Sequence, residues 1–517
     1  MNSASLVVPA ALLLGALPVR ADLLTGVVTD STGAGVPNVN IDAVDAFSGN
    51  PVDVPINTTG ANGSFSLQMP AGVYDVTFKP PSPPTTTHLP LLLGGQVVFG
   101  TTNLGNVALA PGVAVSGRVV GPSGQPVQGV DIDIVDESTG LKIVLTQDDT
   151  NAQGLFAVPA PPGPVTVEFD ATGIAFPVLA SNQVALVLAG DVNLGDVPLQ
   201  PGFVLSGAVK GPGGAPVPGA DIDVRDQATG EKLLTPKDDT NGAGLFSVVV
   251  PAGLYRVEAC APFAAKLATE ELQNVLVNGH GSLGTIFLSS GVVLSGTVTS
   301  FAGQPVSGAD LDLFDPATGA LVPTCADNSG PLGSYAAVAP PGTWKAVFSP
   351  PGFDQPLGAD VHPSVAVFSD TLLNAVLPAC PFAQPYGVGA AGSGGLVPVL
   401  SSSGGAPRVG NDAWAYELSN AVGGTVAFLA LNVSPGSLPL GGGTILVAQD
   451  NFLVLLPVTL GGAPGAPGAG SLSFPFPVPI TEVFSGLTVY AQYIAVDVGA
   501  PPFFFSISQG LSAGFCP

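Results

Sequence analysis

Aspartates return at fixed places along this chain. The stretch "GVDIDIVD" at 129–136 recurs as "GADIDVRD" at 219–226 and as "GADLDLFD" at 308–315. Carboxylate oxygens are the ligands that Ca²⁺ prefers, and six to eight oxygens at about 2.3–2.6 Å complete a site. The candidate calcium ligands of the three repeats are Asp131, Asp133, Asp136, Asp148, Asp149, Asp221, Asp223, Asp226, Asp238, Asp239, Asp310, Asp312 and Asp315.

The same aspartates alternate with apolar residues, which predicts a β-strand with one wet face. In a strand, residues i and i+2 share a face, so Ile132 and Ile134 enter a core while Asp131 and Asp133 point to water. Neighbouring carboxylates on one strand lie about 7 Å apart, too far to share one ion unless a loop folds over them. We therefore favour a solvated face and keep calcium as the alternative.

Other constellations that could do chemistry are weak. The three histidines, His88, His280 and His362, lie far apart in sequence, and none has the short spacing of a zinc site. The stretch "AAGSGG" at 390–395 lacks the first glycine of a nucleophile elbow. We predict no catalytic residue, no cofactor and no enzymatic activity.

The composition indicates an all-β chain that does not favour anionic partners. Of 517 residues, 46% are hydrophobic and 9% charged, with 69 Gly and 53 Pro. Short runs rich in Val, Thr and Phe between Gly and Pro are typical of strands and tight turns. The net charge of −25 repels phosphate backbones and anionic lipid, which argues against nucleic acid and membrane surfaces as partners.

The N-terminus has the pattern of a signal peptide. An apolar run from Leu6 to Val19 ends at small residues before Asp22, and it is too short to span a bilayer. We expect a signal peptide at 1–21 and a secreted or cell-surface protein that is not inserted in the membrane. An exported chain favours disulfides, and its four cysteines allow three pairings. Cys380 and Cys516 bracket the last segment, and we favour a bridge between them.

Self-comparison predicts four tandem domains. The motif "LTGVVTD" recurs as "VSGRVVG", "LSGAVKG" and "LSGTVTS", and its glycines Gly26, Gly117, Gly207 and Gly296 are 91, 90 and 89 residues apart. Each unit holds roughly seven strand-like runs, which suits a small β-sandwich. The expected domains are 22–110, 111–200, 201–290, 291–379 and a distinct 380–517. Short Pro-containing linkers predict a semi-rigid rod.

The order Gly-X-Val, Gly-X-Pro-Val-X-Gly-Ala, Gly-X-Phe and Pro-Ala-Gly-X-Tyr resembles the carboxypeptidase regulatory-like domain over about 22–379. The resemblance implies transthyretin-like β-sandwiches that act as secreted or surface accessory modules without peptidase activity. The related collagen-adhesin B-type modules carry a Lys–Asn crosslink. Lys79, Lys142, Lys210 and Lys345 fall in no common repeat column, so we do not expect this crosslink.

Residues 381–517 break the period and alternate strand-like runs with Gly/Pro turns, which indicates a further β-sandwich or jelly roll. They resemble an uncharacterised C-terminal domain of secreted proteins from planctomycete-type bacteria. We interpret the chain as a non-enzymatic secreted or cell-surface spacer, adhesion or matrix protein. The alternative is a carbohydrate-binding accessory protein with the C-terminal domain as its head. Its partners would be extracellular polysaccharide or other surface proteins, and Trp344, Trp414 and Tyr416 are the candidate sugar-stacking residues.

Overall fold

The computed structural model describes residues 22–145, 147–174, 178–440, 442–480, 482–500 and 504–517. The predicted signal peptide at 1–21 lies outside the described residues. Strands dominate, and the helices in these ranges are short 3₁₀ turns at Pro212–Gly214, Phe263–Ala265, Ser393–Gly395 and Glu482–Phe484. The all-β prediction is confirmed. No helix in the described ranges is long and apolar enough to cross a membrane.

The first unit packs two sheets face to face. In one sheet β1 (Asp22–Thr29) lies between antiparallel β4 (Ser64–Met69) and parallel β7 (Thr101–Ala108). The other sheet has the order β3 (Pro51–Val52), β2 (Asn40–Asp45), β5 (Gly72–Lys79), β6 (Leu91–Val98). The inner faces of both sheets share one hydrophobic cluster, so unit 1 closes its own core.

Three further units repeat this topology, each with a separate hydrophobic cluster. Unit 2 comprises β8 (Val113–Val120), β9 (Asp131–Asp136), β10 (Leu141–Lys142), β11 (Leu155–Ala160), β12 (Gly163–Asp170), β13 (Asn182–Leu188) and β14 (Val192–Pro198). Unit 3 comprises β15 (Phe203–Lys210), β16 (Asp221–Asp226), β17 (Leu245–Val250), β18 (Gly253–Cys260), β19 (Glu270–Val277) and β20 (Gly281–Phe287). Unit 4 comprises β21 (Val292–Ser300), β22 (Asp310–Phe314), β23 (Leu321–Val322), β24 (Ser334–Ala339), β25 (Gly342–Ser349), β26 (Asp360–Val367), β27 (Thr371–Leu372) and β28 (Ala375–Leu377).

The repeated glycine and the repeated aromatic residue are two sides of one contact. Gly117 pairs across the strands with Phe156, and a Cβ on Gly117 would lie 2.9 Å from the Phe156 ring. The ring therefore lies flat over the glycine and packs edge-on against Phe169, with centroids 5.5 Å apart. The equivalent contacts in units 1 and 3 are Gly26–Phe65 and Gly207–Phe246, whereas in unit 4 Gly296 pairs with Tyr335 in register but lies nearest to Leu373.

A buried hydroxyl ties two segments together in every unit. The Thr240 hydroxyl donates to the carbonyl of Val217 at 2.6 Å and accepts the N–H of Ala220 at 2.7 Å. Both backbone groups lie in the interior, where an unpaired polar group is costly. Thr59, Thr150 and Ser329 make the same pair of bonds in units 1, 2 and 4.

The C-terminal part forms a larger and different arrangement of sheets. One sheet holds β29 (Gln384–Tyr386), β39 (Gly510–Gly514), β37 (Thr488–Val496), β32 (Val426–Asn432) and β35 (Val454–Thr459), with β38 (Phe505–Ile507) on β37. A second sheet has β30 (Val399–Ser403), β31 (Ala415–Ala421) and β36 (Gly470–Pro475), and β33 (Pro435–Leu440) pairs with β34 (Gly443–Val447). Trp414, Tyr416 and Phe515 lie in the core between the two main sheets.

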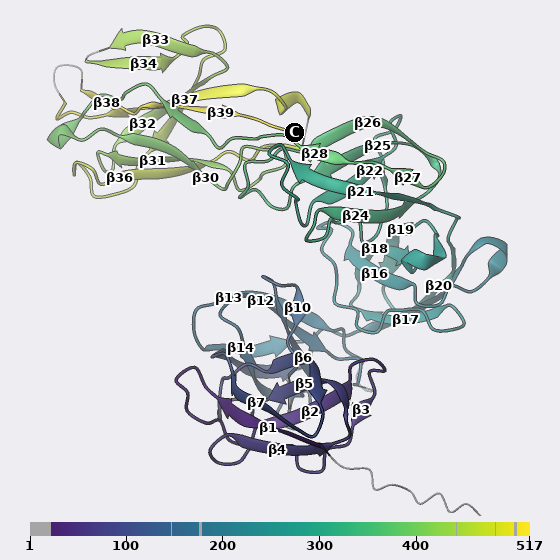
Figure 1. Ribbon diagram of the computed structural model, residues 1–517. Helices are drawn as coiled ribbons and strands as arrows, with labels where there is room; N and C mark the ends of the chain where they lie inside the picture. The colour runs from purple at the N-terminus through teal and green to yellow at the C-terminus, as the bar shows by residue number, and fades with distance from the viewer. Residues whose placement is uncertain (1–21, 146, 175–177, 441, 481, 501–503) are drawn as a thin grey trace, which may run out of the picture.

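Each linker is hydrogen-bonded back to the unit that precedes it. Between units 2 and 3, the N–H of Gly202 donates to Val178 O at 2.9 Å, and the N–H of Ala180 donates to Gln200 O at 3.0 Å. The same two-bond bridge recurs at the other linkers, where the first donors are Gly112, Gly291 and Cys380. Each linker is therefore held on the unit that precedes it. Figure 1 shows the units following one another along a bent path from purple to yellow.

Candidate functional site

The aspartate ladder of unit 3 lies on the outer face of the β16–β18–β19 sheet, as the alternation predicts, but this face is not simply solvated. Asp223 is only 8% exposed. The loop after β16 carries Asp238 back over the strand, so Asp221, Asp223 and Asp238 have ligand atoms that all lie within 4.8 Å of one another. Burial, together with the charges of Asp223 and Asp238, raises the pKa of Asp221 to about 6. The prediction that these acids simply point to water is corrected accordingly.

The third acid of each ladder is not part of this cluster. The Asp226 carboxylate accepts the N–H groups of Ala228 and Thr229, both at 2.9 Å, so it caps its own turn. Asp136 and Asp315 cap the equivalent turns of units 2 and 4. The turn motif Asp-X-X-Thr-Gly, present in "DESTG", "DQATG" and "DPATG", is the sequence signal for this role. Asp149 and Asp239 are exposed.

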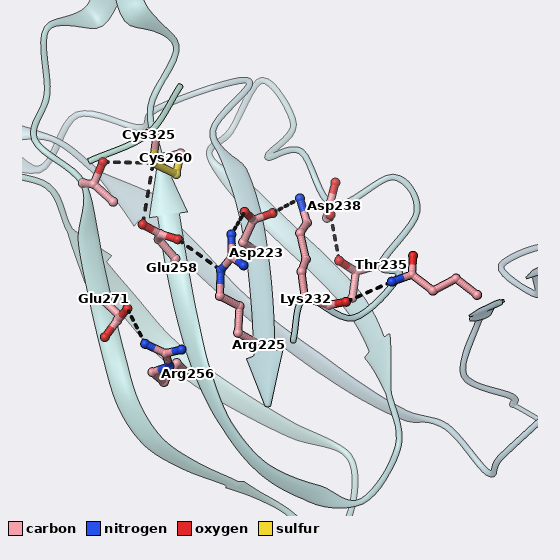
Figure 2. Close-up of polar contacts among 12 residues, drawn as sticks. Asp223, Arg225, Lys232, Thr235, Asp238, Arg256, Glu258, Cys260, Glu271 and Cys325 are labelled. Atoms are coloured by element: carbon pink, nitrogen blue, oxygen red, sulfur yellow. Dashed lines mark hydrogen bonds and ion pairs between the residues drawn. A yellow bond between two sulfur atoms is a disulfide. The ribbon is translucent and has the colours of Figure 1, made fainter. Parts of the chain in front are cut away.

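A lysine occupies the position next to the ladder that a cation would take. Lys232 forms an ion pair with Asp223 in unit 3 (Figure 2). In unit 2, Lys142 Nζ lies 2.7 Å from Asp133 and 3.2 Å from Glu168. Burial alone would lower the pKa of Lys232, but the hydrogen bond and the charge of Asp223 outweigh it, so the pKa is raised. In both units an ammonium group is therefore paired with one aspartate of the ladder.

Lys142 of unit 2 and Lys232 of unit 3 occupy the same position in their repeats. This shared position was not found from the sequence, because Lys232 was not among the four lysines compared. Each of the two follows its aspartate partner, Asp133 or Asp223, by nine residues. This nine-residue interval is the sequence signal that could have identified Lys232 as the partner of Asp223. In unit 1 a lysine from a different place serves the same purpose, since Lys79 Nζ lies 2.9 Å from Asp42. Different residues therefore supply the counter-charge for the same face.

The acidic face of unit 3 continues into the junction with unit 4. Figure 2 shows Glu258 on β18, between Arg225 and the disulfide. Burial is the main cause that raises the pKa of Glu258 to about 7, and the charge of Asp223 adds to it, while Arg225 opposes it from 3.8 Å. Asp327, which belongs to unit 4, also raises this pKa. The two units therefore act on one carboxyl group.

Unit 4 contributes its own ladder to the same place. Cavities of about 330 and 490 Å³ lie between the units and are lined by Glu258 of unit 3 and by Asp310 and Asp327 of unit 4. Burial, with the charges of Asp310 and Asp327, raises the pKa of Asp312 to about 6. Two of the candidate calcium residues of unit 4, Asp310 and Asp312, thus lie in an inter-unit space and not on a separate outer face.

Two disulfides join the four cysteines. Cys260 at the end of β18 is bonded to Cys325 in the loop after β23, with Cα atoms 6.1 Å apart, and this bond crosses from unit 3 to unit 4. Cys380 is bonded to Cys516, with Cα atoms 5.7 Å apart. The second pair is the one that the sequence favoured, and it clips the ends of the C-terminal part together.

The aromatic candidates for sugar stacking are placed differently from that expectation. Trp414 and Tyr416 are both 0% exposed, and their rings pack edge-on with centroids 4.7 Å apart. No face of either ring is free for a sugar, so both are corrected to core residues. Trp344 is half-buried, and its indole N–H donates to Pro340 O at 2.9 Å, which holds the Pro-Pro-Gly turn.

The serine of the weak elbow motif has a structural partner. The Ser393 hydroxyl hydrogen-bonds to Asp497, and the Ser393 N–H donates to the same carboxylate at 2.7 Å. Asp497 is 1% exposed and also accepts the N–H of Gly499 at 3.1 Å. The pair holds two loops of the C-terminal part together, in a 3₁₀ turn and not in the strand-to-helix turn of a hydrolase.

Comparison with known proteins matches one unit to a family. The model of the carboxypeptidase regulatory-like domain matches residues 114–200, which comprise most of unit 2. No curated protein matches the chain in sequence.

Among solved structures, the chain is similar to the Bacillus anthracis TIE protein, with 12% identity over 66% of this chain and 68% of that one and a TM-score of 0.16. It is also similar to a streptococcal ancillary pilin, with 12% identity over 52% and 99% of the two chains and a TM-score of 0.16. The shaft pilin SpaA of Lactobacillus rhamnosus GG shows 12% identity over 34% of this chain and 97% of that one, with a TM-score of 0.17. TM-scores this low transfer no function to the chain. The family match shows that unit 2 is similar to carboxypeptidase regulatory-like domains.

Proposed function

We propose that the protein is a non-enzymatic secreted or cell-surface spacer, in which four transthyretin-like units at 22–110, 111–200, 201–290 and 291–379 hold the C-terminal domain at a distance. Its partners are other surface proteins or extracellular polysaccharide. The planctomycete-type affiliation of residues 380–517 remains part of this proposal.

The observation that carries the proposal is the repeated linker bridge. A flexible string would leave its linkers free, whereas here each linker forms the same two backbone hydrogen bonds with the preceding unit, as Gly202 and Ala180 do. The bridges therefore hold each of the four short linkers on the unit before it, which supports a chain of units that bends only at the residues following each bridge.

The junction with the C-terminal part supports the same conclusion. The Arg408 guanidinium lies 4.4 Å from the centroid of the Phe353 ring of unit 4, and Ala406 N–H donates to Phe353 O at 2.7 Å. Arg408 is 7% exposed. A buried cation on an aromatic ring gives this junction a fixed geometry.

Small-angle X-ray scattering of the full chain tests the spacer. A compact globule of this length has a radius of gyration of about 24 Å, and we expect a value well above that. The matched control is a chain with a four-residue Gly/Ser insertion after Pro201, which disrupts the bridge to Val178. We expect the inserted chain to show a broader distribution of distances. A compact profile for the parent chain, or identical profiles for both chains, would refute the proposed spacer function.

A further inference from the structure

We propose that the Cys260–Cys325 disulfide is a clamp on a charged hinge: it holds units 3 and 4 closed across facing carboxylates, and breaking it opens this junction at neutral pH but not in mildly acid solution. The inference concerns one junction and goes beyond the spacer function.

The disulfide lies where the other units meet by polar contacts. Cys260 is the last residue of β18, and the equivalent residues of units 1 and 2 are Lys79 and Asp170, the last of β5 and β12. Cys325 precedes Ala326, whose φ is +52°. The loops of units 2 and 3 have their positive-φ residue at the equivalent position, namely Gln147 and Lys237. The same strand end and the same loop therefore meet at each of these junctions.

The first two junctions are not covalent. Between units 1 and 2, burial raises the pKa of Asp148, and the charge of Lys79 from unit 1 opposes that rise. Between units 2 and 3, Lys237 Nζ lies 3.4 Å from the Thr172 hydroxyl. Only at the third junction, among the described residues, does a covalent bond replace these contacts.

Acidic side chains from both units line this junction. The unit 3 side of the two cavities presents Asp221, Asp223, Glu258 and Glu271, with Arg225 and Arg256. The unit 4 side presents Asp310, Asp312 and Asp327.

The basic groups of unit 3 pair with acids of their own unit. Arg225 lies 3.6 Å from Asp223, Arg256 lies 3.9 Å from Glu271, and Lys232 pairs with Asp223. The carboxylates of the two units therefore face each other with an excess of negative charge, which pushes the faces apart when the acids are ionised.

Two polar contacts beside the disulfide add little to the junction. Lys266 pairs with Asp370 at 2.7 Å, but both side chains are more than half exposed, so solvent screens the pair. The Thr269 hydroxyl lies 3.1 Å from Cys325 Sγ, which is a contact with the clamp itself. The linker stays bonded to unit 3 through Gly291 and Lys266, so an open junction would pivot at the residues that follow.

Two of the acidic groups at the junction titrate between mildly acid and neutral pH, the range over which we expect the junction to open. The pKa of Glu258 is raised to about 7 and that of Asp312 to about 6, and in both cases burial is the first cause. Protonation of these groups therefore reduces the repulsion in mildly acid solution. In the parent chain, a dithiol reductant can break the Cys260–Cys325 bond. The reductant gives two electrons and two protons to the bond, so that both cysteines become thiols and the reductant becomes a cyclic disulfide.

The experiment compares the full chain with a Cys260→Ser/Cys325→Ser variant, which removes the clamp and leaves the other disulfide intact. Hydrogen exchange, corrected for intrinsic rates, is followed in peptides of residues 261–269 and 321–328, the segments on either side of the disulfide at the junction. At about pH 7.5 we expect the variant to lose protection in both peptides by about tenfold or more, and at about pH 5 to regain it. Adding Glu258→Gln to the variant should restore part of the protection at the higher pH.

Controls make each outcome decisive. A Cys380→Ser/Cys516→Ser variant should leave the junction peptides unchanged, and the core strands β15 and β21 should stay protected throughout. Unchanged protection at neutral pH would show that no clamp is needed. Equal loss of protection at both pH values would show that ionisation of the carboxylates does not control the opening. Loss that extends to β15 or β21 would show that the disulfide stabilises a unit, and it would overturn the hinge.

Discussion

Replacing Glu258 by Gln should make unit 3 more stable at neutral pH and leave it unchanged in acid. The folded structure raises the pKa of this carboxyl from 4.5 to about 7, first through burial and then through the charge of Asp223. An acid whose folded pKa is raised contributes stability that is fully present below pH 4.5. That stability is lost as the pH rises through about 7, because the folded state resists ionisation.

The size of the effect follows from that rise. A change from 4.5 to about 7 corresponds to about 3 kcal/mol between the two protonation states. The side chain is 13% exposed and Arg225 lies nearby, so screening reduces the effect to about 1–2 kcal/mol. Glutamine keeps the shape and removes the charge, so Glu258→Gln should recover this amount above pH 7.

Native-state hydrogen exchange of β16 and β18 in the full chain measures the local free energy of opening. The parent chain should lose stability between about pH 4.5 and pH 7, and the Glu258→Gln chain should show a flatter profile. Glu231→Gln, at an exposed position of the same unit, is the control and should follow the parent. If Glu258→Gln lowers stability at neutral pH, or if its profile superimposes on that of the parent, the assignment of the repulsion to this carboxyl is wrong.

Three further outcomes are expected. Millimolar calcium or EDTA should leave the thermal unfolding of the parent chain unchanged, because Lys232 already pairs with Asp223. The Lys232→Met variant should be less stable and should be stabilised by calcium. A calcium response of the parent chain would contradict this. Thr240→Val should destabilise unit 3 by about 1–3 kcal/mol in denaturant unfolding, because two buried backbone groups lose their partner, while Thr240→Ser should cost much less. Peptide mapping without reductant should recover Cys516 linked to Cys380, and a free Cys516 would exclude that bridge.

The fold could be predicted from the sequence because local patterns decide it. Alternation of the type Asp131–Ile132–Asp133–Ile134 assigns each residue to a face, and the structure leaves both isoleucines at 0% exposure. The Gly117 motif and the Phe156 motif were found as separate signals, yet they form one contact across the strands. Their pairing depends on register, which neither motif carries alone.

The candidate site could be predicted only in part, for the same reason. Alternation identified Asp221 and Asp223, and comparison of the repeats added Asp238, but a strand pattern does not show that the loop brings Asp238 over the other two. The role of Lys232 required comparing columns across repeats, and the burial of Trp414 required knowledge of the second sheet that covers it. Inter-unit chemistry, such as Asp327 acting on Glu258, depends on how two folded units meet and leaves no local signal.

The four units share core positions more closely than junction positions, and packing explains the difference. A Cβ at a core position such as Gly117 would lie 2.9 Å from a ring, so nothing larger than glycine fits. The last residue of the strand at each junction has only to suit the loop that faces it, and the chain places Lys79, Asp170 and Cys260 there. A residue at such a position can change without disturbing either core. A protein built from such units can therefore vary its stiffness at the junctions rather than within the units. The junction between units 3 and 4 is the one that the Cys260–Cys325 disulfide closes covalently.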